Sequence, residues 1–489
     1  MSPRAARIAL AAALAVGIVV RVAFLSSKPF WRDEAWVVLL LNDAAGAVAG
    51  GRPIPLGFLW ATAPARALPL PLEVSLRWLP LCAGLAFLPA LARLATELGA
   101  ATTTRLAAVW LAAGLPALVY YSRELKPYGL DALAAAVVPL LALLGFGGSG
   151  AARRALIVTL ALLPWLTFGA LFPVLAVLAW GWAARWRGLP ADARRDWAIA
   201  TAAFGVSALA VWAFAWRGQM AGPGLRRFWG DWLLAGSDLS PLQRLLVGAE
   251  RYLAVSVSYL FPRPLALPAL ALAALGAATW PAPQRGLLLW LHLGTAAFCI
   301  AAAATDRYLL VEGRLLLFAA PTMLLWVAQG LGTIGRWTRA GGLVLAVPIA
   351  ASLWWSQQAL VHRTRATTTD PILYFRQDVL HDVDVIVARA AEIVPAGAPV
   401  LVSRYGAYAF QVYARGRLAQ ASYCKVYCFD EEGFVRDWLA GVTDAGWVIL
   451  TDEEIQPLHA YLVGAGFAVV PRAAARGVRL WQITRLHPK

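Results

Sequence analysis

Two acidic residues, Asp33 and Glu34, follow the first long apolar run of the sequence and lie between Trp31 and Trp36. Tryptophan is typical of the membrane–water interface, so we expect these carboxylates near the edge of the hydrocarbon. There desolvation raises the pKa of a carboxylate and a bound cation or metal lowers it, and either state can serve as a base toward a hydroxyl group. The alternative is that the pair merely begins a helix, because acidic residues favour helix N-termini.

A second group of charged residues lies between the third and fourth apolar runs, in the segment YYSRELKPYGLD that starts at Tyr120. Its cations Arg123 and Lys126 could bind a phosphate group. Glu124 could join Asp33 around a divalent metal ion or orient a cation. The alternative is a loop whose charges satisfy one another while their stems lie along the apolar surface.

A third group, in the segment DRYLLVEGR, contains Arg307, Tyr308 and Arg314. All three groups begin or end an apolar run, and the order of the runs places them on the same side of the membrane. They predict a polar pocket with carboxylates on one wall and cations on another. Such a pocket suits a lipid phosphate lying at headgroup level.

The elements that must position these groups are membrane-spanning helices. The chain has 489 residues, of which 60% are hydrophobic and 14% charged, and its mean hydropathy is +0.64. These values exclude a disordered chain and a soluble globular domain. The net charge of +16 does not indicate a nucleic-acid partner, because the basic residues alternate with long apolar runs.

Apolar runs long enough to cross the hydrocarbon predict about eleven spans. That count includes a hairpin of two short helices, packed inside the protein, in residues 155–182, which contain Pro164, Thr167, Gly169 and Pro173. The N-terminus is predicted inside, because the loops on that side are rich in arginine. Those arginines are Arg153, Arg154, Arg185, Arg187, Arg194, Arg195, Arg285, Arg336 and Arg339.

Two domains are predicted, each from its composition. Residues 1–360 form the membrane domain, with long outer loops at 26–71 and 217–264. Residues 361–489 alternate strand-like and helical patterns, which predicts an extracytoplasmic α/β domain. The expected strands lie at 399–403, 447–451 and 479–483, and the expected helices at 378–393, 432–439 and 453–463. Cys424 and Cys428 could form a disulfide, but two unpaired thiols are the favoured interpretation.

The motifs together resemble the GT-C superfamily of membrane glycosyltransferases, in the branch of protein O-mannosyltransferases and the lipid A aminoarabinose transferase. The matching features are WRDEAW after the first span, RPIPL at residues 52–56, RWLP at 77–80 and YYSRELKPYGLD at 120–131. An arginine several residues before Pro321 opens a late span, as in the family. The family's His-Pro-Pro-Leu is replaced by Pro-Ile-Pro-Leu, so a histidine role in that loop is absent.

The resemblance implies an inverting transferase that takes a sugar from a polyprenyl-phosphate donor at the outer face of the cytoplasmic membrane. Its acceptor would be an envelope lipid, glycan or protein, and membrane lipids would surround it. Asp33 would be the general base, and Glu34 would support it through hydrogen bonds or by contacting the acceptor. Glu124 would line the site with a second carboxylate. If a divalent metal is used, Asp33 and Glu124 would be its ligands. Arg123, Lys126 and the late-loop residues would bind the donor phosphate.

Two questions remain open from the sequence. Arg307-Tyr308 preserves the family's dipeptide, whereas Arg314 preserves its spacing to Pro321, and both registers are retained. The second question is whether the protein instead moves lipid-linked saccharides without bond formation, as a carrier or flippase. A carrier should place charges near the bilayer midplane, whereas here they lie at the ends of spans, which favours the enzyme. A third hypothesis, beside the transferase and the carrier, makes the C-terminal domain a binding module and the spans its membrane anchor. One span would be enough for an anchor, so about eleven predicted spans argue against it.

Overall fold

A computed structural model of the chain describes residues 2–23, 25, 29–43, 54–217, 233–234, 238–261, 263–310, 313–338, 347–351, 354, 382–414, 418, 421–424 and 432–486. These residues group into two compact units. A helical unit contains the described residues up to 25 and from 54 to 354. A second unit contains residues 29–43 and 382–486.

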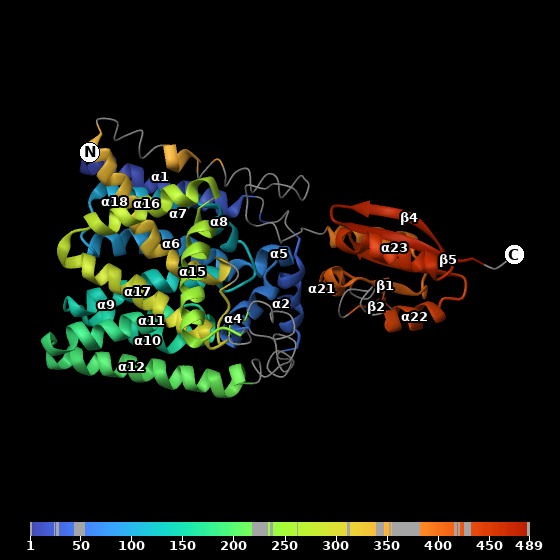
Figure 1. The fold of residues 1–489 in the computed structure, drawn as a ribbon, viewed down its shortest axis with the longest axis horizontal. Helices are drawn as coiled ribbons and strands as arrows, with labels where there is room; N and C mark the ends of the chain where they lie inside the picture. Colours follow the sequence, from blue (N-terminus) through green and yellow to red (C-terminus); the bar gives the residue numbers. More distant parts are fainter. Residues whose placement is uncertain are drawn as a thin grey trace. The chain divides into compact units, whose positions relative to one another are not determined.

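The helical unit is built from hydrophobic helices (Figure 1). Its longer helices are α1 (Pro3–Val22), α6 (Trp78–Glu97), α7 (Thr102–Gly114), α9 (Tyr128–Phe146), α10 (Gly150–Leu166), α11 (Leu171–Trp180), α12 (Ala191–Val211), α15 (Pro241–Leu260), α16 (Arg263–Thr279), α17 (Ala282–Ala304) and α18 (Ala320–Trp337). The shorter helices are α4 (Leu56–Thr62), η1 (Ala63–Ala67), α5 (Leu72–Ser75), α8 (Pro116–Tyr121), η2 (Gly181–Arg185), η3 (Trp186–Gly188), η4 (Trp212–Trp216) and η6 (Gly313–Ala319).

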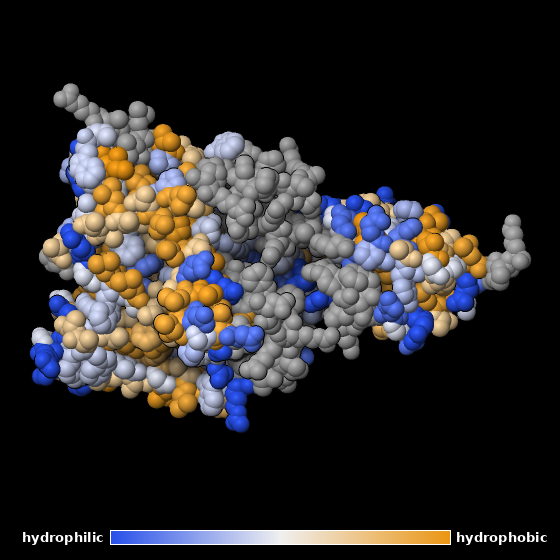
Figure 2. Space-filling model, viewed as in Figure 1, coloured by the Kyte–Doolittle hydropathy of each residue, from blue (hydrophilic) through white to orange (hydrophobic). Residues whose placement is uncertain are grey.

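Six helices among the described residues are long and apolar enough to cross a bilayer, and the bent pair α15–α16 would make seven. Apolar side chains cover much of the visible face of this unit (Figure 2). Val206 and Leu209 on α12 and Phe214 on η4, for example, are all more than half exposed. Exposed side chains of this kind need lipid around them, so the protein is a multi-pass membrane protein. The predicted count of about eleven spans stays a prediction.

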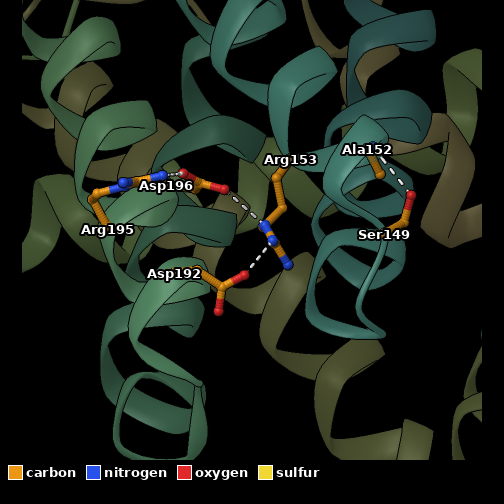
Figure 3. Close-up of polar contacts among 6 residues, drawn as sticks. All are labelled: Ser149, Ala152, Arg153, Asp192, Arg195 and Asp196. Atoms are coloured by element: carbon orange, nitrogen blue, oxygen red, sulfur yellow. Dashed lines mark hydrogen bonds and ion pairs between the residues drawn. The ribbon is translucent and has the colours of Figure 1, made fainter.

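The predicted break within residues 155–182 is confirmed and separates α10 from α11. The interpretation that both helices are packed inside was wrong for α10, whose side chains are largely exposed or half-buried. Helix α10 runs beside α12 (Figure 1). Arg153 on α10 joins the two helices by ion pairs to Asp192 at 2.6 Å and Asp196 at 2.8 Å (Figure 3).

Helices α16 and α18 pack closely because each carries a glycine where they meet. A Cβ on Gly276 would lie 1.9 Å from the carbonyl oxygen of Trp326, and one on Gly330 would lie 2.1 Å from that of Leu272. Small residues allow membrane helices to approach each other's backbone in this way. Because the clashing atoms are backbone oxygens, no side-chain rotation could relieve a larger residue.

Gly330→Ala is therefore expected to destabilise the protein by about 1–3 kcal/mol or more, since the two helices must separate. Thermal unfolding of the purified protein in detergent measures the change. Gly205→Ala on α12 is the matched control, because a methyl group there meets nothing within 4 Å. Equal melting temperatures for the two variants would contradict the close packing.

The second unit contains a five-stranded sheet in the order β2-β1-β3-β5-β4. The strands are β1 (Val400–Val402), β2 (Ala421–Tyr423), β3 (Ala445–Thr451), β4 (Phe467–Ala475) and β5 (Val478–Arg485). Strand β1 is parallel to β2 and β3, whereas β5 is antiparallel to β3 and β4. The helices are α20 (Val383–Ile393), α21 (Arg404–Tyr413), α22 (Glu432–Ala440), η8 (Asp452–Glu454) and α23 (Ile455–Gly464).

The three predicted strands and three predicted helices of this unit are confirmed, whereas β2, β4 and α21 were not predicted. Cys424 is disulfide-bonded, so the preference for unpaired thiols was wrong for this residue. Cys428 lies outside the described residues. The predicted division also differs in one respect: helix α2 (Arg32–Leu40), assigned to the membrane domain, groups with this unit.

Candidate functional site

Asp33 and Glu34 lie in the first turn of α2, as the helix-start interpretation predicts. The Asp33 side chain is about one-fifth exposed and lies 3.6 Å from Arg32 Nε. Both this cation and the helix N-terminus stabilise a carboxylate. Glu34 is fully buried, and its Oε2 accepts a hydrogen bond from the backbone nitrogen of Trp31 at 3.4 Å. Glu34 thus caps α2 and leaves Asp33 as the accessible carboxylate of the pair.

The Arg123–Lys126 segment forms a tight loop between α8 and α9. Pro116 begins α8, and Pro127 is the N-cap of α9. The loop packs on α6 where Gly84 lacks a side chain, since a Cβ there would lie 2.2 Å from Ser122 Cβ. Within the loop Arg123, Glu124 and Lys126 are at most 6% exposed. The charged groups of this loop therefore lie largely inside the protein and do not extend into solvent.

Three buried arginines meet at the C-terminal end of α1, and we call Arg21, Arg77 and Arg123 the α1-end arginines. Arg123 donates to the carbonyl of Ala23 at 2.7 Å, and Arg77 donates to that of Leu25 at 3.4 Å. The carbonyl groups at a helix C-terminus carry partial negative charge, which favours guanidinium groups. Helix capping therefore explains part of this arrangement.

Arg21 extends the same group into the helices. Its guanidinium donates to the carbonyls of Gly17 at 3.1 Å, Ala113 at 3.0 Å and Ala112 at 2.8 Å. Sequence reasoning did not identify Arg21 or Arg77 as site residues. An arginine at the end of an apolar run looks like an ordinary interfacial cation, and no local signal shows that it is fully buried.

Arg314, from the third charged group of the sequence, lies beside the α8–α9 loop. Its guanidinium carbon lies 5.8 Å from the ring centre of Tyr128, the first residue of α9, which is a cation–π contact. Tyr128 also contacts Tyr121 edge to face at 5.4 Å, and the hydroxyls of Tyr121 and Tyr259 are hydrogen-bonded. The structure therefore brings Arg314 to the second charged group through an aromatic cluster.

Arg307 and Tyr308 are placed differently from Arg314. Arg307 is exposed in the turn after α17. Tyr308 packs edge to face on Phe172 at 4.7 Å, and its hydroxyl donates to the carbonyl of Leu315 at 2.6 Å. Burial raises the pKa of Tyr308 well above its ordinary value, and the charge of nearby Asp131 raises it further. The phenol thus stays protonated, and its hydrogen bond fixes the segment that carries Arg314.

Asp131 is a buried residue of this region that sequence reasoning left without a role. It accepts a hydrogen bond from the hydroxyl of Thr167 and one from the backbone nitrogen of Ala170 at 2.9 Å. A Cβ on Gly169 would lie 2.8 Å from the same carboxylate. Asp131 therefore connects the first turn of α9 to the break between α10 and α11, just after the charged loop.

The predicted metal ligands Asp33 and Glu124 belong to different units. In the part of the chain that the structure describes, no three His, Cys, Asp or Glu side chains gather as a metal site. Asp33 is already paired with Arg32. A divalent metal ion bound by Asp33 and Glu124 therefore stays a prediction.

No family model and no curated protein sequence matches the chain. Solved structures do match it, among them the following two. ArnT from Cupriavidus metallidurans bound to undecaprenyl phosphate aligns with 99% of this chain and 98% of its own, at a TM-score of 0.55 and 12% identity. The Archaeoglobus fulgidus oligosaccharyltransferase in complex with Zn and sulfate aligns with 96% of this chain and 72% of its own, also at a TM-score of 0.55 and 12% identity.

Both structures are GT-C glycosyltransferases. The chain has the GT-C fold. The predicted fold class, a polytopic helical domain followed by a small α/β domain, is confirmed by these matches and by the sheet of the second unit. At this level of identity the match concerns the fold, and the roles of individual residues rest on their own geometry.

Proposed function

We propose that the protein is an inverting glycosyltransferase that takes a sugar from a polyprenyl-phosphate donor at the outer face of the cytoplasmic membrane. The observation that carries this proposal is the set of buried cations around the α8–α9 loop, namely the α1-end arginines and Lys126. Charged side chains buried in a membrane protein often mark a substrate site, and a cluster of cations at the interface suits a lipid phosphate. The matching ArnT structure, which contains undecaprenyl phosphate, supports this choice of anion.

In this mechanism Asp33 takes the proton from a hydroxyl or amine of the acceptor. The acceptor atom then attacks the anomeric carbon of the sugar from the face opposite the phosphate. The bond between that carbon and the phosphate oxygen breaks, and polyprenyl phosphate leaves with one more negative charge. Arg123, Lys126 and Arg314 stabilise this charge, and Glu34 holds the turn of α2 that carries the base.

We assign Arg314 rather than Arg307 to the donor phosphate. Arg314 contacts Tyr128 beside the charged loop, whereas Arg307 is exposed and the hydroxyl of Tyr308 is engaged with Leu315. Glu124 is fully buried in the same loop as Arg123 and Lys126. Its negative charge would orient these cations and limit their mutual repulsion.

The direct test supplies purified protein with polyprenyl-phosphate sugars and an extract of envelope lipids, glycans and proteins. Transfer of labelled sugar to an acceptor is the expected result. The Arg314→Gln variant should transfer more slowly than an Arg307→Gln variant. If the wild-type protein transfers nothing from any donor but moves lipid-linked sugars across vesicles, the protein is a carrier instead.

A further inference from the structure

The helix that carries Asp33 packs on a helix of the C-terminal α/β domain. Helix α2 contacts α21 within the second unit. Phe30, which precedes α2, is fully buried, and its ring stacks on Tyr413 with centroids 6.4 Å apart and planes 27° apart. The hydroxyl oxygen of Tyr413 also accepts a hydrogen bond from the backbone nitrogen of Phe30 at 2.8 Å. One tyrosine therefore holds both the ring and the backbone at the start of α2.

Tyr413 is itself fixed to the sheet through α21. This helix begins directly after β1, and the backbone nitrogen of Ser403 between them donates to Ile449 of β3 at 2.8 Å. One turn before Tyr413, the ring of Phe410 is fully buried and contacts Tyr423 of β2 edge to face at 5.9 Å. A continuous set of packed groups thus runs from the sheet to the first turn of α2.

We propose that the C-terminal α/β domain positions the general base, with Tyr413 as the positioning residue. The inference rests on the proposed function, because it takes Asp33 as the base. Asp33 lies three residues after Phe30, so a rotation of the backbone at Phe30 would displace the carboxylate directly. A catalytic group that is displaced by about 1 Å can lose about 100-fold in rate. The domain therefore contributes to the chemical step.

The test compares Tyr413→Phe with Tyr461→Phe in the full-length protein. Tyr413→Phe keeps the ring stack but removes the acceptor for the nitrogen of Phe30. Tyr461 on α23 is a matched control in the same unit. Its hydroxyl also makes a hydrogen bond to the backbone, since it donates to the carbonyl of Glu432 at 3.1 Å. Tyr413→Ala removes both the ring stack and the hydrogen bond and should have the larger effect.

Two measurements are made on each variant. Hydrogen exchange followed by mass spectrometry reports the opening of residues 29–43, which should be several-fold faster in Tyr413→Phe than in Tyr461→Phe. Steady-state transfer assays should show a kcat about tenfold lower in Tyr413→Phe, with an unchanged KM for the polyprenyl-phosphate sugar. A structural defect of the whole protein would instead change both variants or both kinetic parameters.

The outcomes separate the two proposals. If exchange and kcat in Tyr413→Phe equal those in Tyr461→Phe, the positioning role of the C-terminal domain is overturned. If the wild-type protein transfers no sugar from any donor, the proposed function fails. In that case the exchange rates alone decide whether Tyr413 holds the start of α2.

Discussion

Asp33→Asn is expected to reduce the rate of sugar transfer by about 10²- to 10⁴-fold, because the amide cannot accept the proton of the acceptor. Asparagine has nearly the shape of aspartate, so α2 should keep its first turn. The KM for the donor should change little, since the donor phosphate is assigned to other side chains. Steady-state kinetics with a labelled polyprenyl-phosphate sugar measure both parameters.

Asp43→Asn is the matched control for this prediction. Asp43 is exposed just beyond the C-terminal end of α2, so its replacement removes one carboxylate from the same segment without changing the first turn. Normal transfer by Asp33→Asn would show that another group is the base. Equal losses in both variants would point to the net charge of the segment and not to proton transfer.

Arg123→Gln is expected to raise the KM for the donor about 30-fold or more. A buried charge-assisted interaction with phosphate typically contributes about 2 kcal/mol or more, which corresponds to that factor in affinity. Arg123→Lys should lie between the wild type and the glutamine variant, because lysine keeps the charge but loses the planar pair of donors. Direct binding of undecaprenyl phosphate in detergent provides a second measurement that does not depend on turnover.

Arg93→Gln serves as the control for Arg123→Gln. Arg93 lies near the C-terminal end of α6, is more than half exposed, and pairs with Glu97 at 2.6 Å. Because Arg123 also donates to Ala23, thermal unfolding of each variant must be measured beside binding. A weaker affinity at an unchanged melting temperature supports a phosphate ligand, whereas an unchanged affinity removes Arg123 from the donor site.

Local sequence was enough to predict the features that depend on neighbouring residues. The long apolar runs predicted the long helices, and short strand-like runs predicted β1, β3 and β5. The acidic pair Asp33–Glu34 gave the alternative interpretation of a helix start, because acidic residues favour helix N-termini, and this interpretation is confirmed. The motif at 120–131 identified the loop that proves to be buried, because so many charged residues in a short link between two apolar runs are unusual.

The rest depends on contacts between residues far apart in the sequence. Arg21 meets carbonyls that lie 91 and 92 residues later, and Phe30 meets a tyrosine 383 residues later. Neither partner carries a distinctive local pattern. The two late arginines could not be told apart for the same reason, since only the contact of Arg314 with Tyr128 distinguishes their surroundings. Strands β2 and β4 were missed because β2 has three residues and β4 contains a proline.

The contacts of Arg21 have a consequence for the order in which the helices pack during synthesis. Helix α1 enters the membrane first, but the carbonyls of Ala112 and Ala113 belong to α7, which has not yet been synthesised. At about 5–20 residues per second, the delay is roughly 5–20 s. During that time the guanidinium of Arg21 must reach the lipid headgroups, which its place in the last turn of α1 allows. The first helix can therefore take its final place only after α7 has been inserted.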